Sequence, residues 1–126
     1  YVNAGHNPPF LIKKKDKKLT ISRLEKTGSL IGIFNENTWK TKTIKIKPGD
    51  VLILYTDGIT EAFNAEMDAF GEDRLAALAD TLSTGRPEVM AKTVLEAVSR
   101  FIGSAAVSDY RTLLCVKYQV GNDALS

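Results

Sequence analysis

Two aspartates flank the most apolar stretches of this sequence. Asp57 follows the continuous apolar run 51–55, and Asp109 stands shortly before a second run, 113–118. Antiparallel neighbours place the end of one strand beside the start of the other, so we expect both carboxylates at one edge of a sheet. Carboxylate oxygens are ligands that Mg²⁺ and Mn²⁺ prefer, and a divalent cation would relieve the repulsion between two acids. The alternative for each aspartate is an ordinary turn or helix N-cap residue.

A glycine and a histidine supply two further candidates. Gly58 directly follows Asp57, and glycine lets a backbone approach a ligand closely. His6, the only histidine, lies in the Pro-containing turn Asn3–Pro9 after a strand end. A lone histidine cannot build a zinc site, which needs several His or Cys ligands, but it could support a metal ligand or act as a general acid. A plain turn histidine is the alternative.

The single cysteine, Cys115, is a nucleophile by residue type only. It lies within the apolar run 113–118, whereas a reactive thiol needs exposure and a basic neighbour. We therefore expect Cys115 to pack in the core. One Cys in 126 residues also favours a reducing compartment, so the cytoplasm is the expected location. The sequence contains no Gly-x-Gly-x-x-Gly, P-loop or Gly-x-Ser-x-Gly motif.

Basic residues are concentrated in one tract, Lys13 to Lys18, which holds five Lys and one Asp. The formal net charge of +2 comes from this Lys tract, since the remaining residues carry slightly more acid than base. Nucleic-acid binders usually spread Lys and Arg over a face and interleave aromatic residues for stacking, so no nucleic-acid partner is expected. The tract is interpreted as a solvated hairpin tip, with contact to an acidic partner as the alternative.

The first half of the chain has the pattern of β structure. Residues 10–12 and 19–24 predict a hairpin across the Lys tract, and residues 38–47 predict a half-exposed strand because their second half alternates with period 2. Pro48-Gly49-Asp50 predicts a turn into the buried strand 51–55.

The second half changes to a helical period. A stripe of Leu75, Leu78, Ala79 and Leu82 predicts one helix, which residues 83–85 end. Arg86-Pro87-Glu88 opens a second helix, and residues 103–106 form a loop before a last buried strand at 113–118. The apolar stripe of the second helix consists of Val89, Met90, Thr93, Val94, Ala97, Val98 and Phe101. This order predicts an α+β fold, with two helices on one face of a mainly antiparallel sheet.

Length and composition fit one globular domain. The chain has 126 residues, of which 44% are hydrophobic and 25% charged, and this excludes a disordered, collagen-like or disulfide-rich class. Its apolar stretches are too short to span a membrane, so no membrane contact is expected from this segment. The chain lacks an initiator Met and begins like the middle of a strand, which predicts a piece of a longer protein.

Six motifs follow one another along the chain. They are Asn3-Ala4-Gly5-His6-Asn7-Pro8-Pro9, Ile31-Gly32-Ile33, Pro48-Gly49-Asp50, Leu54-Tyr55-Thr56-Asp57-Gly58-Ile59-Thr60-Glu61-Ala62, Phe70-Gly71-Glu72-Asp73-Arg74-Leu75 and Asp109-Tyr110-Arg111-Thr112-Leu113-Leu114. In this order they resemble the SpoIIE-like bacterial branch of the PPM (protein phosphatase 2C-like) metal-dependent serine/threonine phosphatases. The resemblance extends over about residues 1–120, and residues 121–126 form a polar tail.

This resemblance implies part of an α-β-β-α sandwich with a pair of Mn²⁺ or Mg²⁺ ions at one end of its sheets. Such an ion pair activates a water for attack on phosphoserine or phosphothreonine. By the match, Asp57 and Asp109 are metal ligands, Gly58 is a backbone hinge beside the metal, and His6 stands near the metal-bound water. The implied substrate is a phosphorylated regulatory protein, as for phosphatases that act on antagonists of anti-sigma factors in stress or sporulation signalling.

Two departures from the family pattern modify these expectations. The family's other essential Asp-Gly pair lies upstream of the Asn-Ala-Gly-His motif, where this chain has only Tyr1 and Val2. Residues 1–120 are therefore expected to be the C-terminal portion of the domain, with no metal pair and little activity alone. Tyr110 replaces the Asp or Asn that usually follows Asp109, and it cannot serve as a carboxylate or amide ligand. This favours the alternative function, a degenerate phosphatase fold used for protein binding in signalling.

An incomplete sandwich also leaves sheet edges and an apolar face uncovered. Such surfaces invite pairing with another chain. We therefore expect self-association of this segment or pairing with the missing half of the domain.

Overall fold

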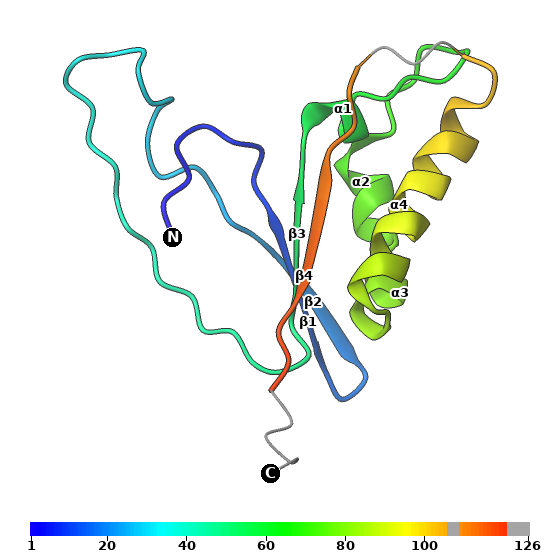
Figure 1. The fold of residues 1–126 in the computed structure, drawn as a ribbon, viewed down its shortest axis with the longest axis horizontal. Helices are drawn as coiled ribbons and strands as arrows, with labels where there is room; N and C mark the ends of the chain where they lie inside the picture. Colours follow the sequence, from blue (N-terminus) through cyan, green and yellow to red (C-terminus); the bar gives the residue numbers. More distant parts are fainter. Residues whose placement is uncertain (106–108, 121–126) are drawn as a thin grey trace.

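A computed structural model describes residues 1–105 and 109–120 of the chain. It contains one antiparallel sheet with a layer of helices on one side (Figure 1). The strands are β1 (Phe10–Lys15), β2 (Lys18–Arg23), β3 (Val51–Tyr55) and β4 (Leu113–Lys117). The helices are α1 (Asp57–Thr60), α2 (Gly71–Ala77), α3 (Ala79–Thr84) and α4 (Pro87–Ile102).

The hairpin across the Lys tract forms as predicted. Strands β1 and β2 pair antiparallel out to Lys15 opposite Lys18, so the turn consists of Asp16 and Lys17 alone. Asp16 adopts a φ of 55°, a left-handed conformation that a two-residue turn requires and that Asp tolerates better than most residues. The Lys tract therefore occupies the tip of a regular hairpin.

Three strand ends meet at one end of the sheet. The strand order is β2-β1-β3-β4, and every neighbouring pair is antiparallel. Phe10 at the start of β1 pairs with Ile53, and Leu113 at the start of β4 pairs with Tyr55 at the end of β3. Because of this register, the segments before β1, after β3 and before β4 all emerge at the same end.

The helices bury one face of the sheet. Alternate residues of β1 and β3 face the helical layer, and the buried side chains of α4 recur every four residues. The core consists of Phe10, Ile12, Val51, Ile53, Tyr55, Ile59, Ala62, Phe70, Leu75, Ala79, Leu82, Met90, Val94, Val98 and Ile102.

Both predicted helices are present, with differences in detail. The first predicted helix is divided at Leu78, whose ψ of −7° separates α2 from α3. The structure also contains α1, a single helical turn after β3. The second helix begins at Pro87 as predicted, but Val89 is 47% exposed. Val89 immediately precedes the buried Met90, and one residue along a helix turns the side chain by about 100°, away from the sheet.

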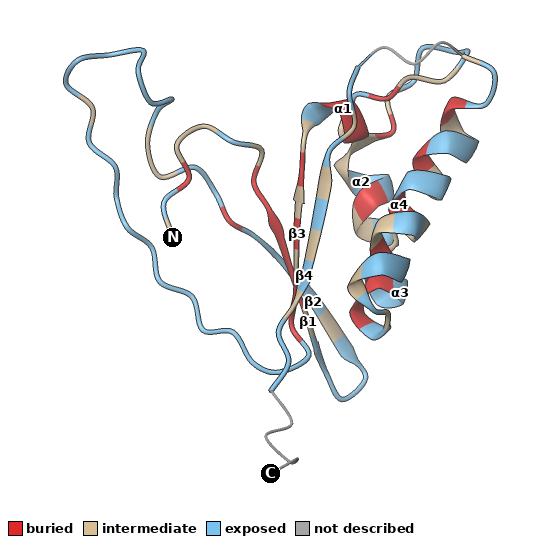
Figure 2. Cartoon of the chain, viewed as in Figure 1, coloured by how far each residue is buried: buried red, intermediate tan, exposed pale blue. Residues whose placement is uncertain are grey.

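The other face of the sheet is apolar and open over β3 and β4, whereas Leu11 of β1 is buried there. Leu114 is 54% and Val116 is 45% exposed, while Leu52 and Leu54 beside them in β3 are half-buried. The prediction that β4 is fully buried is therefore wrong for this face, because helices cover only the opposite one (Figure 2). The open face supports the expectation of self-association or of pairing with a missing half, which stays a prediction.

The strand predicted at 38–47 is absent, although isolated backbone bonds form there. Tyr1 and Lys42 exchange both N–H···O bonds, as in an antiparallel pair, and the Lys40 N–H donates to the Thr27 carbonyl. No continuous ladder follows within the described segment 24–50, so Ile44 and Ile46 remain exposed. Residues with an alternating pattern form a strand only where a neighbouring strand can share their backbone hydrogen bonds. The predicted tail, 121–126, and residue 106 of the predicted loop lie outside the described residues.

Cys115 packs against the core as predicted, and burial raises the pKa of its thiol from 9.0 to about 11. At about pH 8 the thiolate should be roughly 100-fold scarcer than in the unfolded chain, and a disulfide reagent should react correspondingly slowly. Colorimetric thiol titration with and without denaturant measures this difference. Since the folded pKa is the higher one, stability from this group should be present below pH 9 and lost as the pH rises to about 11. Equal reaction rates in both states would contradict the assignment.

No helix in residues 1–105 and 109–120 combines the length and apolar character needed to cross a membrane.

Candidate functional site

Asp57 stands at the junction of β3 and α1. The helix begins at Asp57 itself, and the buried Ile59 fixes this single turn on the core. The Asp57 side chain is exposed, and its Oδ1 accepts a hydrogen bond from the Gly58 N–H at 3.1 Å. The carboxylate is therefore held at the sheet end by a rigid backbone, while its other oxygen makes no hydrogen bond within the described residues.

Thr56 attaches the segment that carries Asp109 to the end of β3. The Thr56 N–H donates to the Thr112 carbonyl, and the Thr56 Oγ1 accepts from the Thr112 N–H, both at 3.1 Å. The same hydroxyl lies 3.4 Å from the Tyr110 carbonyl. The Asp57 and Asp109 segments therefore lie side by side, as the strand pattern predicts (Figure 1). Sequence reasoning overlooked Thr56; a hydroxyl residue at the end of a buried strand was the available signal.

Gly58 permits the closest backbone approach at this end of the molecule. A Cβ built on Gly58 would lie 2.2 Å from the Tyr110 carbonyl oxygen and 2.9 Å from its carbonyl carbon. Both atoms belong to the backbone and cannot rotate away as a side chain could. Gly58 therefore sets the separation of the two aspartate segments, and its role is structural contact between backbones.

His6 lies on the exposed part of the loop that precedes β1. Its Nδ1 is 2.7 Å from the Asn7 carbonyl oxygen, and no hydrogen bond joins it to Asp57 or Asp109 among the described residues. The loop is anchored at Asn3, whose Nδ2 donates to the Leu24 carbonyl at 3.0 Å. The loop reaches the same sheet end as the aspartates, while the role of His6 stays a prediction.

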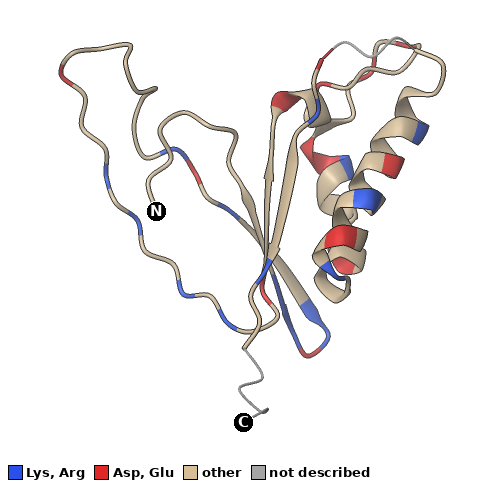
Figure 3. Cartoon of the chain, viewed as in Figure 1, with Lys and Arg blue, Asp and Glu red and all other residues tan. Residues whose placement is uncertain are grey.

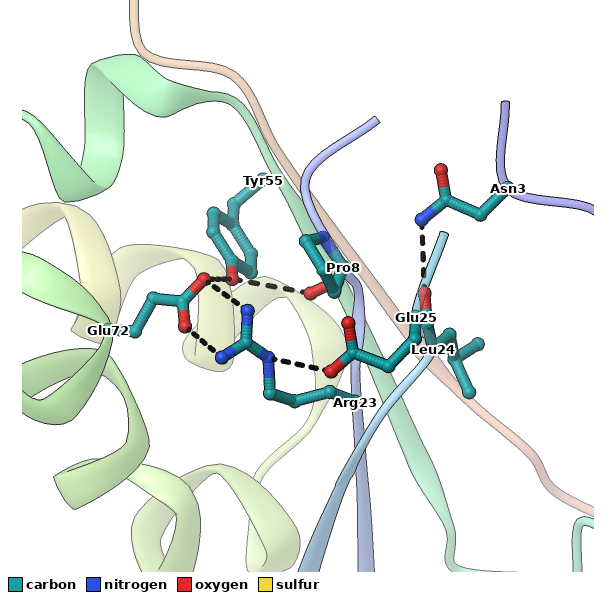
Figure 4. Close-up of polar contacts among 7 residues, drawn as sticks. All are labelled: Asn3, Pro8, Arg23, Leu24, Glu25, Tyr55 and Glu72. Carbon is teal, nitrogen blue, oxygen red and sulfur yellow. Dashed lines mark hydrogen bonds and ion pairs between the residues drawn. The ribbon is translucent and has the colours of Figure 1, made fainter. Parts of the chain in front are cut away.

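A polar network ties this loop to β3 and α2 (Figure 4). The Tyr55 hydroxyl lies 2.8 Å from Glu72 Oε1 and 3.2 Å from the Pro8 carbonyl oxygen. Arg23 contacts both oxygens of Glu72, at 2.8 and 3.2 Å, and its Nε lies 3.4 Å from Glu25. Two sequence features could have predicted this network: the Phe70-Gly71-Glu72 motif and a tyrosine within an apolar strand. A buried tyrosine hydroxyl needs a hydrogen-bond partner, and Glu72 is the partner in this structure.

Tyr55 should contribute measurably to stability through this network. Burial and the hydrogen bond to Glu72 raise the pKa of the Tyr55 hydroxyl above its ordinary 10.0, so stability should also fall as the pH rises above about 10. The Tyr55→Phe variant keeps the ring and loses the hydroxyl, and we expect a loss of about 2 kcal/mol in the free energy of unfolding.

Urea titration followed by circular dichroism measures this loss. Tyr118→Phe is the matched control, because Tyr118 is 42% exposed and its hydroxyl makes no hydrogen bond in the part of the chain that the structure describes. Equal stability of the two variants would show that the network contributes nothing.

The donor set of this sheet end fits part of a site for a hard cation. Asp57 and Asp109 offer carboxylate oxygens, the ligand type of Mg²⁺ and Mn²⁺. Within residues 1–105 and 109–120, no group of three or more His, Cys, Asp or Glu side chains could hold a metal ion. Two carboxylates alone fall short of the six or more ligands such ions take, so the described residues do not complete such a site.

A model of the family described as Stage II sporulation protein E (SpoIIE) matches residues 1–119. The chain belongs to the SpoIIE family. The family predicted from the six motifs is thereby confirmed, and so is the α+β fold with an antiparallel sheet.

The chain is also similar to two relatives in sequence and to one solved structure in fold. Protein IcfG of Synechocystis sp. is 32% identical over 109 residues, which are 86% of this chain and 17% of IcfG. Phosphoserine phosphatase RsbU of Bacillus subtilis is 36% identical over 61 residues, 48% of this chain and 18% of RsbU. The phosphatase domain of the cell fate determinant SpoIIE from Bacillus subtilis (Mn presoaked) has the same fold, with a TM-score of 0.56 and 23% identity over 94% of this chain.

The SpoIIE-family match covers only part of each of these proteins. This chain spans under a fifth of IcfG and RsbU, and 49% of the SpoIIE phosphatase-domain chain. The fold of a SpoIIE-family phosphatase domain is thus present in part, with one sheet and one helical layer in the described residues.

Proposed function

We propose that this chain is the C-terminal portion of a metal-dependent protein serine/threonine phosphatase domain. The observation that carries the proposal is the pairing of the Asp57 and Asp109 segments at one sheet end of a SpoIIE-family chain. Coverage of about half of a SpoIIE phosphatase-domain chain supports the partial status.

In this proposal Asp57 and Asp109 hold Mn²⁺ or Mg²⁺ together with ligands from the preceding part of the domain. When bound, the metal pair supplies charge neutralisation at the phosphoryl group and a more acidic water. The residues of this chain perform the positioning: Thr56 fixes the Asp109 segment, and Gly58 allows its close approach. His6 is proposed to hold a proton near the reacting phosphate, from the loop that Tyr55 and Asn3 anchor.

The proposed substrate is a phosphoserine or phosphothreonine on a regulatory protein in the cytoplasm. The similarity to RsbU, which is named a phosphoserine phosphatase, supports this class. The low cysteine count is consistent with a reducing compartment. The 126 residues alone are expected to be inactive, because two carboxylates do not complete the ligand set.

A second candidate function is protein binding by a catalytically degenerate phosphatase fold. Tyr110 favours it, since its side chain is 92% exposed and offers neither a carboxylate nor an amide beside Asp109. In this case the fold would serve recognition alone.

Phosphatase assays on the parent protein that contains these residues distinguish the two functions. We expect hydrolysis of p-nitrophenyl phosphate and of a phosphoserine peptide with Mn²⁺, loss of both with a chelator, and recovery when Mn²⁺ is restored. A folded parent without Mn²⁺-dependent hydrolysis would overturn the phosphatase proposal. Recovery of hydrolysis and of Mn²⁺ binding by Tyr110→Asp would then identify Tyr110 as the cause.

A further inference from the structure

The Lys tract is joined in space by a second basic segment. The Lys13 ammonium donates to the Lys45 carbonyl, which brings residues 45–48 against the hairpin. Together they surround a hollow of about 720 Å³. Its lining contains five lysines and two acids, and consists of Lys13, Lys14, Lys15, Asp16, Lys18, Thr20, Lys47, Pro48 and Asp50. Figure 3 shows these two basic segments at the hairpin end of the sheet, away from α1. The sequence pattern suggested a solvated tip, with contact to an acidic partner as the alternative, and it gave no sign of Lys47, which is distant along the chain.

The shape of this hollow follows from the sheet register. The pairing of β1 with β3 ends at Ile12 opposite Val51, whereas β1 continues with β2 to Lys15. The hairpin therefore projects beyond the start of β3 and leaves a notch in the sheet. The turn Lys47-Pro48-Gly49-Asp50 forms the other wall of this notch.

That wall is fixed by several bonds. The Gly49 N–H donates to the Tyr118 carbonyl at 2.9 Å, and the Tyr118 N–H donates to the Asp50 carbonyl at 3.0 Å. The Asp50 side chain, in a residue only 8% exposed, accepts from the Lys47 N–H at 2.9 Å. Gly49 has a φ of 93°, which explains glycine at this position. Lys47 is therefore held opposite the hairpin by a built turn.

The lysines that line the notch outnumber the acidic residues in and beside it, which are Asp16, Asp50 and Asp80. Asp50 lies 3.8 Å from Lys13, and Asp80 of α3 lies 2.7 Å from Lys14. Lys15, Lys18 and Lys47 have no carboxylate within 4 Å in the described ranges 1–105 and 109–120. A concave surface lined by like charges concentrates the field and attracts the opposite charge.

We propose that this notch is a docking site for an acidic segment of a partner protein, separate from the aspartate end of the sheet. Lysines are point charges on flexible stems, and each exposed contact contributes less than about 1 kcal/mol, so several carboxylates on one segment are needed for binding. The volume suits a few side chains of a peptide. Among the described residues, no Arg and no aromatic side chain lines the notch, which disfavours nucleic acid, and its concave shape favours a peptide over a flat lipid surface.

Fluorescence anisotropy with a labelled peptide of alternating Glu and Ser tests this proposal on the full chain. We expect binding that a Gln-Ser peptide does not show and that weakens as salt rises from about 50 to about 200 mM. The double variant Lys15→Glu/Lys18→Glu should lower the affinity about tenfold or more. The control Lys92→Glu/Arg100→Glu changes net charge equally on the outer face of α4 and should lower the affinity less than about twofold.

The outcomes separate the alternatives. An equal loss in the α4 control would show attraction by net charge alone and overturn the proposal. Tighter binding of duplex DNA, or of phosphatidylserine vesicles, with the same loss in the hairpin variant would also overturn it in favour of that partner. If the hairpin variant does not fold, NMR of the wild-type chain provides the test. The proposal requires that peptide addition change the backbone chemical shifts of residues 13–20 and 45–50. The result does not depend on phosphatase activity, so failure here leaves the proposed function intact.

Discussion

An Asp57→Asn variant of the parent protein is expected to keep its fold and lose phosphatase activity. The substitution preserves the size of the side chain and an oxygen that can accept the Gly58 N–H bond. It removes the negative charge that the proposed Mn²⁺ site requires. We expect a loss of about 3 kcal/mol of transition-state stabilisation, or roughly 100-fold in kcat/KM, and weaker Mn²⁺ binding by calorimetry.

Asp73→Asn is the matched control for this experiment. Asp73 lies on the exposed side of α2, and the structure gives its side chain no hydrogen bond or ion pair within the described residues. The same loss of charge there should leave kcat/KM and Mn²⁺ affinity unchanged. Full activity of Asp57→Asn would remove Asp57 from the metal site and with it the main support for the proposed function.

Gly58→Ala should be the most destabilising single-methyl substitution at this sheet end. The added Cβ would meet the Tyr110 carbonyl oxygen at 2.2 Å, and the segment that carries Asp109 would have to move away. We expect a loss of about 3 kcal/mol in the free energy of unfolding, measured by urea titration of the full chain. In the parent protein the same displacement should reduce Mn²⁺ affinity, because it separates the two aspartate segments.

Gly85→Ala provides the comparison, since Gly85 has a φ of −76° and its Cβ would meet no atom closer than 3.4 Å. This variant should change stability by less than about 0.5 kcal/mol. A Gly58→Ala chain as stable as Gly85→Ala would show that the backbone at Tyr110 yields freely, and that Gly58 does not set the distance between the strands' ends.

Sequence patterns correctly predicted the elements whose stabilising contacts lie between residues close together in the chain. The Lys tract hairpin closes across a two-residue turn, and Pro87 begins α4, because both signals operate within a few residues. The segment 38–47 has an equally clear alternation and forms no strand, since a strand exists only with a neighbour to share its backbone bonds. Periodicity indicates which side chains of a strand would lie on the same face. It does not indicate whether a neighbouring strand or a covering layer is present.

The candidate site was also predictable only as far as residue types and strand order allow. Residue types and strand order placed Asp57 and Asp109 at one sheet end, and the structure brings their segments together. Thr56, which bonds the two segments together, and the Tyr55–Glu72 pair, which anchors the loop that carries His6, depend on contacts between residues far apart in the sequence. The same holds for Lys47 at the hairpin notch, where a distant turn adds its charge to a local tract.

The pairing of β3 with β4 also determines when the candidate site comes into existence. Tyr55 pairs with Leu113, and the whole helical layer lies between them in the chain. Closing so long a loop costs more entropy than closing the β1–β2 hairpin, so we expect this pairing to form after that hairpin. In a nascent chain, Asp57 is synthesised well before the Asp109 segment that the sheet register places beside it. Under the proposed function, metal binding by both aspartates would follow the pairing of β4 with β3.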